Sequence, residues 1–493
     1  MGTTVKAATL IKTMNSRIRT LLLASTLVLA TETTAYPRLN LPQMGEPADL
    51  VMSPRDEMRI GRGFMRQIRT QLDLVTDPEV NDYVQRLGKR LVSTQPGVDA
   101  DDFTFFVVRN PEINAFAIPG GFIGINSGLI TAAGNESQLA SVVAHEAAHV
   151  LQRHIARSIA SQGNQGLKTA AAIVAAILIS QRSTEAGQAA LLTGLAASRQ
   201  SSINFTRSNE YDADRLGIQL LSDANYNPRG MVDFFEVLRR RTALNVTEQL
   251  EFLQTHPLTI NRISEARNNA ERLVNPVGIQ DSTDFQFQQM KLKVMHSNTP
   301  DTMLRALRNG HISNSESARL YGQILLHLDS GQLQQATPLA ERLLELQPYN
   351  NSAKLIGARV AMDNRDYGKA ELLLTSITDI QPDNYAASDI LIDTLLRQKK
   401  NGLAEQVIRQ YLRSTNTPVP TVYRKYARVH ELNGQLTAAH EAMADHYFSL
   451  DETREGMGQL ELALKSADED SNDSDRVSAR LEALRKRIAD ASR

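Results

Sequence analysis

The sequence contains no cysteine and no tryptophan, and the absence of cysteine excludes several kinds of site. Without thiols it can form no disulfide, no zinc–thiolate site, no cysteine nucleophile and no lipid-modified N-terminal cysteine. Aromatic residues are only 5% of the chain, and its 493 residues include just 27 glycines and 17 prolines, so a turn-rich β-sandwich is not expected. The 54 Lys and Arg residues balance 55 Asp and Glu residues, and this net charge of −1 gives no support to nucleic-acid binding.

The N-terminal segment has the pattern of a secretory signal peptide. Basic residues precede a short apolar run at residues 21–30, and a small-residue site ends at Ala35. The run is about half the length that a membrane-spanning helix needs, which favours cleavage near Ala35 over an uncleaved anchor. We therefore expect residues 1–35 to be removed on export. The length of 493 residues predicts two or three domains, and beyond the signal peptide we place two, at residues 36–276 and 283–490.

Local patterns in residues 36–276 predict a mixture of helices and short strands. Asp77-Pro78 begins a helix whose apolar stripe is Val80, Val84, Leu87 and Leu91. Residues 103–108 read as a strand, residues 119–121 as a turn, and residues 122–125 as a second strand. Two apolar stretches, 170–179 and 189–197, are too short to span a bilayer. We expect them to be buried or surface-lying helices, with peripheral membrane or unfolded-client contact as the alternative.

The last third of the chain contains an internal repeat. Ala336, Ala370 and Ala404 are spaced at 34 residues, and Pro348 and Pro382 share that spacing. Ala438 or Ala439 gives a fourth, slightly shifted copy. A small residue at a fixed place lets paired helices approach, and 34 residues is the tetratricopeptide period. An ordinary helical domain with chance spacing is the alternative. The array is expected to begin near Phe285.

A metal-binding motif lies between these segments. His145 and His149 are four residues apart in His-Glu-x-x-His, so on a helix both imidazoles reach one metal ion. Glu146 lies beside them, where it can act as general base toward the attacking water. A catalytic zinc needs a third protein ligand and an open position. Glu210 is the candidate ligand, and Asp214, on the same helical face, can orient a ligating histidine.

Asp212 faces the other side of that helix and is expected to be solvent-facing or structural. His154 is five residues beyond His149, about 140° around a regular helix, which predicts a surface or packing residue. The histidines at 296, 311, 327, 430, 440 and 446 form no ligand spacing.

The two motifs together resemble the gluzincin metallopeptidases of the HtpX heat-shock protease and the CAAX prenyl endopeptidase. The resemblance covers residues from about 55 to 270, and it is closest to an exported branch that carries tetratricopeptide repeats. It implies a mainly α fold: an α+β zincin-type metalloprotease domain with a short sheet, followed by an all-α tetratricopeptide-repeat superhelix. It also implies one Zn²⁺ per chain, and Phe122, Ile123, Gly124 and Ile125 as an edge strand that pairs with extended substrate.

The same resemblance implies a periplasmic role in the quality control of outer-membrane proteins. Unfolded or misassembled outer-membrane proteins would be the substrates, and the barrel-assembly machinery would be a partner through the repeats. Two other functions remain open from the residues alone. One is a binding module or chaperone with a vestigial metal site, which the intact Glu146 disfavours. The other is a structural zinc site, which normally has four protein ligands.

His256 is a candidate for control of the site. It precedes Pro257, which disfavours helix and places His256 on a loop. Its imidazole is expected either to fill the fourth zinc position at rest or to stabilise the oxyanion. Arg262 is a second candidate, for an oxyanion or carboxylate contact or for a salt bridge that holds the loop. Alternatively, His256 and Pro257 only cap a helix, and Arg262 is structural.

Overall fold

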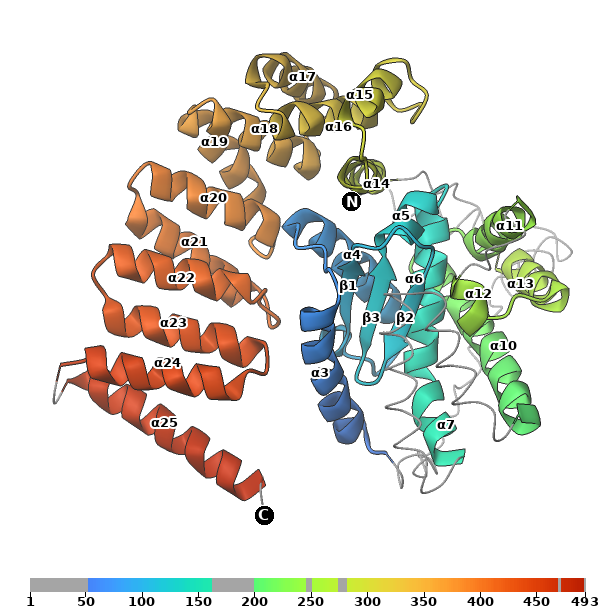
Figure 1. The fold of residues 1–493 in the computed structure, drawn as a ribbon, viewed down its shortest axis with the longest axis horizontal. Coiled ribbons are helices and arrows are strands. Elements are labelled where there is room, and N and C mark those ends of the chain that lie inside the picture. Colours follow the sequence, from blue (N-terminus) through green and yellow to red (C-terminus); the bar gives the residue numbers. More distant parts are fainter. Residues whose placement is uncertain (1–51, 162–198, 245–250, 274–281, 469–470, 492–493) are drawn as a thin grey trace, which may run out of the picture. The chain divides into compact units, whose positions relative to one another are not determined.

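The computed structural model describes residues 52–161, 199–244, 251–273, 282–468 and 471–491 (Figure 1). The predicted signal peptide and the apolar stretches at 170–179 and 189–197 lie outside the described residues. Among the helices that are described, none is both long and apolar enough to cross a membrane.

A three-stranded sheet lies in the first region of the fold (Figure 1). Its strands are β1 (Thr104–Val108), β2 (Ala115–Ile118) and β3 (Phe122–Asn126), in the order β1-β3-β2. Strand β3 pairs in parallel with β1 and antiparallel with β2. Gly120 and Gly121 join β2 to β3 with φ values of 82° and 81°, a conformation that glycine adopts without a Cβ clash. This confirms the predicted turn and both predicted strands.

The prediction that Phe122, Ile123, Gly124 and Ile125 form an edge strand is wrong. They lie in β3, which has a ladder partner on each side. After β1 the chain forms β2 and then turns back into β3, which lies between β1 and β2 in the sheet. Strand β2 has a ladder partner on one side only among the described strands.

Helices surround this sheet and supply most of the core. They are α3 (Pro54–Gln71), α4 (Pro78–Val92), α5 (Ser127–Ala132), α6 (Glu136–Leu151), α7 (His154–Ser161), α10 (Arg199–Asp223), α11 (Arg229–Leu244), α12 (Glu251–Thr255) and α13 (Ile260–Arg272), with a short 3-10 turn at Ala100–Asp102. Asp77 caps α4 through the amides of Glu79 and Val80, and the predicted stripe of α4 is buried. Helix α6 is buried along nearly its whole length, between the sheet and helices α10 and α11.

The C-terminal part is all helical, as predicted. Its helices are α14 (Thr283–Met295), α15 (Pro300–Arg308), α16 (Glu316–Asp329), α17 (Leu333–Leu346), α18 (Asn351–Asp363), α19 (Tyr367–Thr378), α20 (Tyr385–Arg397), α21 (Asn401–Ser414), α22 (Thr421–Leu432), α23 (Leu436–Ser449), α24 (Thr453–Ser466) and α25 (Asn472–Ala491). Within them, α17, α19 and α21 begin at a constant 34-residue spacing.

The small residues of the repeat lie where these helices touch. Ala336, Ala370 and Ala404 are each the fourth residue of their helix, and each is fully buried. Ala439 takes the same place in α23, one residue out of register, while Ala438 is only half-buried. A larger side chain would separate the helices, so this spacing reflects packing and not chance.

Helix α14 contributes side chains to two hydrophobic clusters, one around the sheet and α6 and one among the C-terminal helices. Phe285 and Leu292 pack in the cluster that includes the sheet and α6, whereas Phe287 and Met290 pack with α16 and its neighbours. Buried Lys291 adds a polar tie, because its Nζ lies 3.0 Å from Asp77 and 2.5 Å from Glu79 at the start of α4. The predicted division at residues 276–283 stays a prediction.

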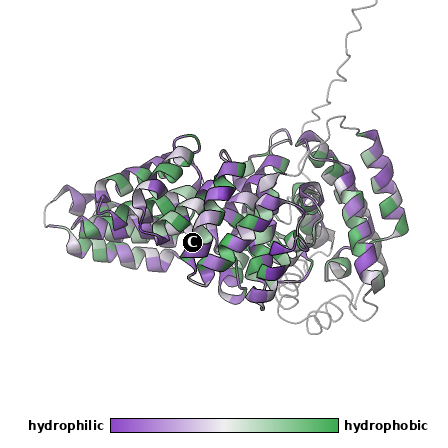
Figure 2. Cartoon of the chain, turned by 90° about the horizontal axis from the view of Figure 1, so that it is seen from above, coloured by the Kyte–Doolittle hydropathy of each residue, from purple (hydrophilic) through white to green (hydrophobic). Residues whose placement is uncertain are grey.

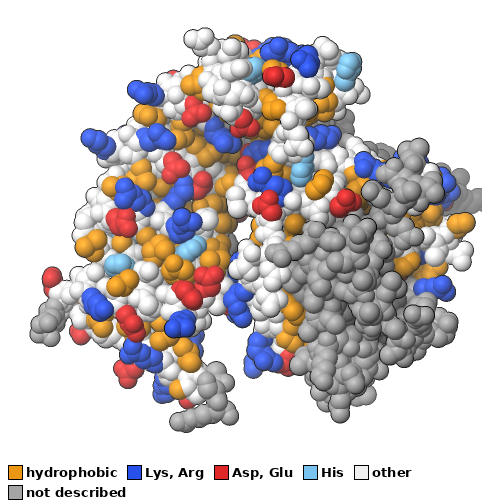
Figure 3. Space-filling model, in the orientation of Figure 1, with side chains coloured by type: hydrophobic (Ala, Val, Ile, Leu, Met, Phe, Trp, Pro, Cys, Tyr) orange, Lys and Arg blue, Asp and Glu red, His pale blue; other side chains and the backbone are white. Residues whose placement is uncertain are grey.

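The surface helices are amphipathic. Figure 2 shows hydrophilic and hydrophobic residues mixed along the helices, as expected of helices that bury one face. On the face in Figure 3, the acidic and basic side chains of the described residues are interspersed, which matches the near-zero net charge.

Candidate metal centre

Helix α6 presents the His-Glu-x-x-His motif from inside the core. Asn135 caps the helix through the amide of Gln138, and a run of small and branched residues lets it pass beside the sheet. His145 and Glu146 are only 2% and 1% exposed. His149, one turn further, is half-buried. The helix thus places both imidazoles and the carboxylate at one spot, as the spacing predicts.

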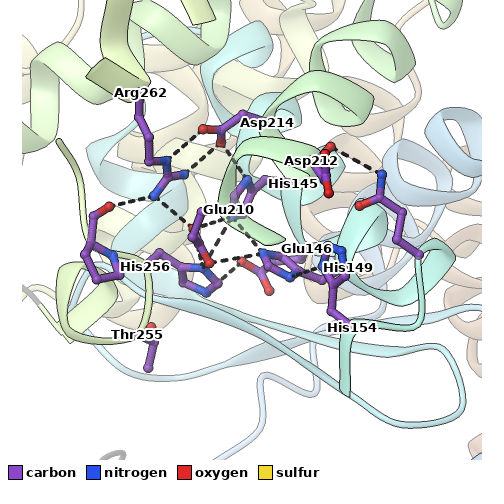
Figure 4. Close-up of polar contacts among 12 residues, drawn as sticks. His145, Glu146, His149, His154, Glu210, Asp212, Asp214, Thr255, His256 and Arg262 are labelled. Carbon is purple, nitrogen blue, oxygen red and sulfur yellow. Dashed lines mark hydrogen bonds and ion pairs between the residues drawn. The ribbon is translucent and has the colours of Figure 1, made fainter. Parts of the chain in front are cut away.

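Helix α10 brings the second motif to the same place. It packs closely along α6, and the close approach requires Gly217, where a Cβ would stand 3.3 Å from the backbone nitrogen of His145. Glu210 and Asp214 are both 3% exposed and face the histidines, while Asp212 is partly exposed on the other side. Figure 4 shows this arrangement.

Four possible ligand atoms converge at this point. Among the described residues, one group can hold a metal ion, and it consists of His145, His149, Glu210 and His256. The Nε2 atoms of His145 and His149 are 3.1 Å apart, and they lie 3.4 and 3.5 Å from oxygens of Glu210. Tetrahedral zinc with ligands at about 2.0–2.1 Å sets its ligand atoms about 3.3 Å apart. The four side chains therefore fit a zinc ion.

Asp214 orients one ligating histidine, and the neighbouring imidazoles set the charge state of Glu210. Oδ1 of Asp214 lies 3.0 Å from Nδ1 of His145, so this carboxylate orients the ring whose Nε2 faces the other ligands. Burial raises the pKa of Glu210, but His256, His145 and His149 outweigh it and hold that pKa well below its ordinary value. Glu210 is therefore ionised and able to ligate at neutral pH.

Glu146 stands beside the ligands without joining them. Burial raises its pKa, while the nearby imidazoles of His256 and His145 lower it in part. One carboxylate oxygen is 3.4 Å from Nε2 of His256 and has no hydrogen-bond partner among the described residues. A raised pKa and an unpartnered oxygen suit a group that takes up and returns a proton.

The loop between α12 and α13 carries His256 into the cluster. Its Nδ1 lies 3.0 Å from Oε1 of Glu210 and 3.3 Å from Nε2 of His145. The ring stacks on buried Phe252, with centroids 4.8 Å apart. The structure thus brings His256 to the metal ligands, which is the arrangement expected of a fourth ligand.

Arg262 is buried in α13 and binds carboxylates of both motifs. Its guanidinium makes two 2.7 Å contacts with Asp214 and one of 2.8 Å with Glu210, and it donates to the carbonyl of Pro257. Of the predicted roles, this geometry matches the carboxylate contact and the salt bridge that holds the loop.

The sequence did not predict the environment of His154. This histidine is only 4% exposed, and its Nδ1 is 2.8 Å from Nδ1 of His149 (Figure 4). Helix α6 ends at Leu151, and Arg153 takes a left-handed φ of 52°, so the regular-helix angle used for the prediction does not apply. Burial, with a contribution from Arg157, lowers the pKa of His154 to about 4, which keeps it neutral.

Motif, fold and geometry together define a metalloprotease that uses a His-Glu-x-x-His helix and a glutamate from a second helix. The comparison with known proteins agrees, because the profile of peptidase family M48 matches residues 78–270. The chain belongs to this family, as the sequence resemblance implied.

Three relatives illustrate the range of similarity. The β-barrel assembly-enhancing protease of Escherichia coli (strain K12) is 35% identical over 337 residues, which cover 68% of each chain. The protein of that name from Yersinia pestis is 36% identical over 63% of this chain and 64% of its own. The mitochondrial metalloendopeptidase OMA1 of Schizosaccharomyces pombe is 30% identical over 37% of this chain and 50% of its own.

Proposed function

We propose that this protein is a zinc endopeptidase that holds one Zn²⁺ per chain on His145, His149 and Glu210. The observation that supports the proposal is the convergence of four possible ligand atoms within 4.8 Å of one another, with the buried carboxylate of Glu146 beside them. A divalent ion in this place would polarise the scissile carbonyl and lower the pKa of the attacking water.

Glu146 is proposed as the general base and acid. Its carboxylate takes a proton from the attacking water and later returns it to the leaving amine. Glu146 is buried, so bulk water screens its charge little and its interactions with neighbouring groups are strong. Asp214 and Arg262 hold the ligands in place and touch no reacting atom.

His256 is proposed as a removable fourth ligand. Four protein ligands close a zinc site, whereas catalysis needs one open position, so His256 must leave before substrate binds. If it is a latch, His256→Ala should raise basal proteolysis and retain zinc. If it donates to the oxyanion instead, the same change should lower turnover by on the order of a hundredfold. Unchanged activity and zinc content would remove it from both roles.

Strand β2 replaces β3 as the proposed substrate strand. Its outer edge has no ladder partner among the described strands, and the backbone of Ala117 lies near enough to Glu146 to lower the pKa of that carboxyl. An extended peptide paired with this edge would lie beside the base, held by main-chain groups and without sequence preference. All four residues of β2 are buried, so a substrate must displace whatever covers the edge.

The proposed setting is the periplasm, after removal of residues 1–35. The names of the relatives suggest a role in β-barrel assembly, and the pattern of residues 1–35 supports export. We propose misfolded or stalled outer-membrane proteins as substrates. The 34-residue helical repeats, which we assign to the tetratricopeptide class, would dock the barrel-assembly machinery and could hold unfolded clients in a chaperone-like manner. Crosslinking and pull-down through residues 283–490 would identify these partners.

One experiment separates the proposed function from its alternatives. Casein cleavage by the purified protein is measured with and without a chelator, next to Glu146→Gln and the matched control Asp212→Asn. A zinc endopeptidase is inhibited by the chelator, and Glu146→Gln keeps zinc but loses cleavage. A structural zinc site or a pure chaperone would show no chelator-sensitive cleavage in any variant.

A further inference from the structure

The break between α6 and α7 places a fourth histidine, His154, against the metal ligands. In an uninterrupted helix, His154 would point about 140° away from His149. The left-handed turn at Arg153 instead starts α7 (His154–Ser161) so that the two rings meet edge to face, with centroids 4.9 Å apart. Their Nδ1 atoms are separated by 2.8 Å, a hydrogen-bond distance.

The direction of this hydrogen bond follows from the place of the other nitrogen. Nε2 of His149 faces the cluster, 3.1 Å from His145 and 3.5 Å from Glu210, so Nε2 is the atom offered to a metal. A neutral imidazole that ligates through Nε2 carries its proton on Nδ1. His149 therefore donates, and His154 accepts through Nδ1 with its own proton on Nε2.

Several contacts hold the break in this unusual conformation. The guanidinium of Arg153 lies 2.6 Å from Glu57 on α3 and donates to the carbonyl of Met52 at 2.7 Å. The side chain of Gln152 donates to the carbonyl of Asp212 on α10 at 3.3 Å. Two elements distant in sequence thus fix a left-handed residue that costs free energy by itself.

We infer that His154 is a positioning residue for the metal site, which fixes the ring orientation and tautomer of His149 by accepting its Nδ1 proton. It does for His149 what Asp214 does for His145. A neutral acceptor suits the charge balance of the site, because the carboxylates of Asp214 and Glu210 already supply the two negative charges that match a divalent ion. The inference rests on the proposed metal site.

The test is the affinity of the full-length protein for Zn²⁺, measured by competition with a chromophoric chelator. His154→Phe keeps the ring volume but removes the acceptor, and we expect a 10- to 100-fold weaker affinity. His154→Asn places an amide oxygen near the position of Nδ1, and we expect an affinity within about threefold of the unchanged protein. Equal affinity in the Phe variant, or equal losses in both variants, would overturn the inference.

His327 offers a matched control. It is 2% exposed near the end of its helix, and its Nδ1 bonds Gln332 five residues away at 2.7 Å, but it lies in the repeats. His327→Phe should leave zinc affinity unchanged. Thermal unfolding of the metal-free variants monitors folding, and if the Phe variant does not fold, the Asn variant decides: a loss beyond tenfold contradicts the inference. Absence of zinc binding by the unchanged protein would instead refute the proposed function.

Discussion

The helical repeats and the region around the metal ligands differ in the kind of contact that holds them together. In the repeats, each helix touches its neighbours in sequence, and buried alanines at 34-residue intervals set the spacing. Around the metal ligands, charged and polar side chains from α6, α10 and the loop before α13 meet in the core. Burial of ionised groups costs desolvation free energy that offsets what their pairing gains, so these contacts hold the geometry of the site and add little net stability.

The contrast predicts where substitutions act on function and where they act on folding. A change in the metal cluster should alter zinc binding and cleavage first. A change in the repeats should alter stability and leave the cleavage of a short peptide intact.

The largest effect is expected from Glu210→Ala. Loss of a ligand should weaken zinc affinity by more than about a hundredfold and abolish cleavage of casein. Asp212→Ala, on the same helix but the other face, is the matched control and should change neither. Zinc content by mass spectrometry and casein cleavage measure the result, and normal zinc content in Glu210→Ala would show that another residue is the third ligand.

Lys291→Met tests the tie between the two regions. The change leaves Asp77 and Glu79 without their buried counter-charge, and we expect a loss of about 3 kcal/mol in the free energy of unfolding. Lys425→Met, which breaks the more exposed pairs with Asp389 and Asp393, should cost less than about 1 kcal/mol. Urea unfolding measures both, and equal losses would contradict a special role for Lys291.

Ala370→Leu tests the packing of the repeats. Extra methylenes at a fully buried helix contact should cost about 1–3 kcal/mol in unfolding free energy. Leu372→Ala, at a side chain that is 73% exposed on the same helix, should cost little. Both variants should cleave a short unstructured peptide at the normal rate. A lost cleavage rate in Ala370→Leu would show that the repeats control the metal site.

The smallest effect concerns Asp82 in α4, next to the repeats. Burial raises its pKa to about 6, Arg86 lowers it in part, and Asp383 raises it further. The folded state therefore binds this proton more tightly than the unfolded state, so stability falls as pH rises from about 4 to about 6. Asp82→Asn should remove the penalty and gain on the order of 1 kcal/mol at pH 7, with no gain at pH 4. Urea unfolding at both pH values measures it, and equal gains would contradict the assignment.

The features that sequence predicted well depend on local spacing. The i, i+4 geometry of a helix relates His145 to His149 and Glu210 to Asp214, so their common faces could be read directly. The alanine period of the repeats has the same local origin. The structure confirms the fold class and brings His145, His149 and Glu210 together with Glu146 beside them.

The features that sequence missed depend on contacts between distant segments. The order of the sheet follows from β1 pairing with β3 across the hairpin, so no local pattern could show that β2 and not β3 lies at the edge. The left-handed turn at Arg153 is held by Glu57, almost a hundred residues earlier in the chain. This turn is the feature that brings His154 to His149. A signal for it existed only in the helix-ending sequence after Leu151, which does not specify the direction of the turn.

The most direct measurement is a crystal structure of the zinc-loaded protein with anomalous data at the zinc edge. The account predicts one anomalous peak per chain, about 2.0–2.2 Å from Nε2 of His145, Nε2 of His149 and a carboxylate oxygen of Glu210, with Nδ1 of His256 as the fourth ligand at rest. Glu146 should lie beside the peak without binding it. A peak ligated by Glu146, or zinc bound anywhere else in the chain, would contradict the account.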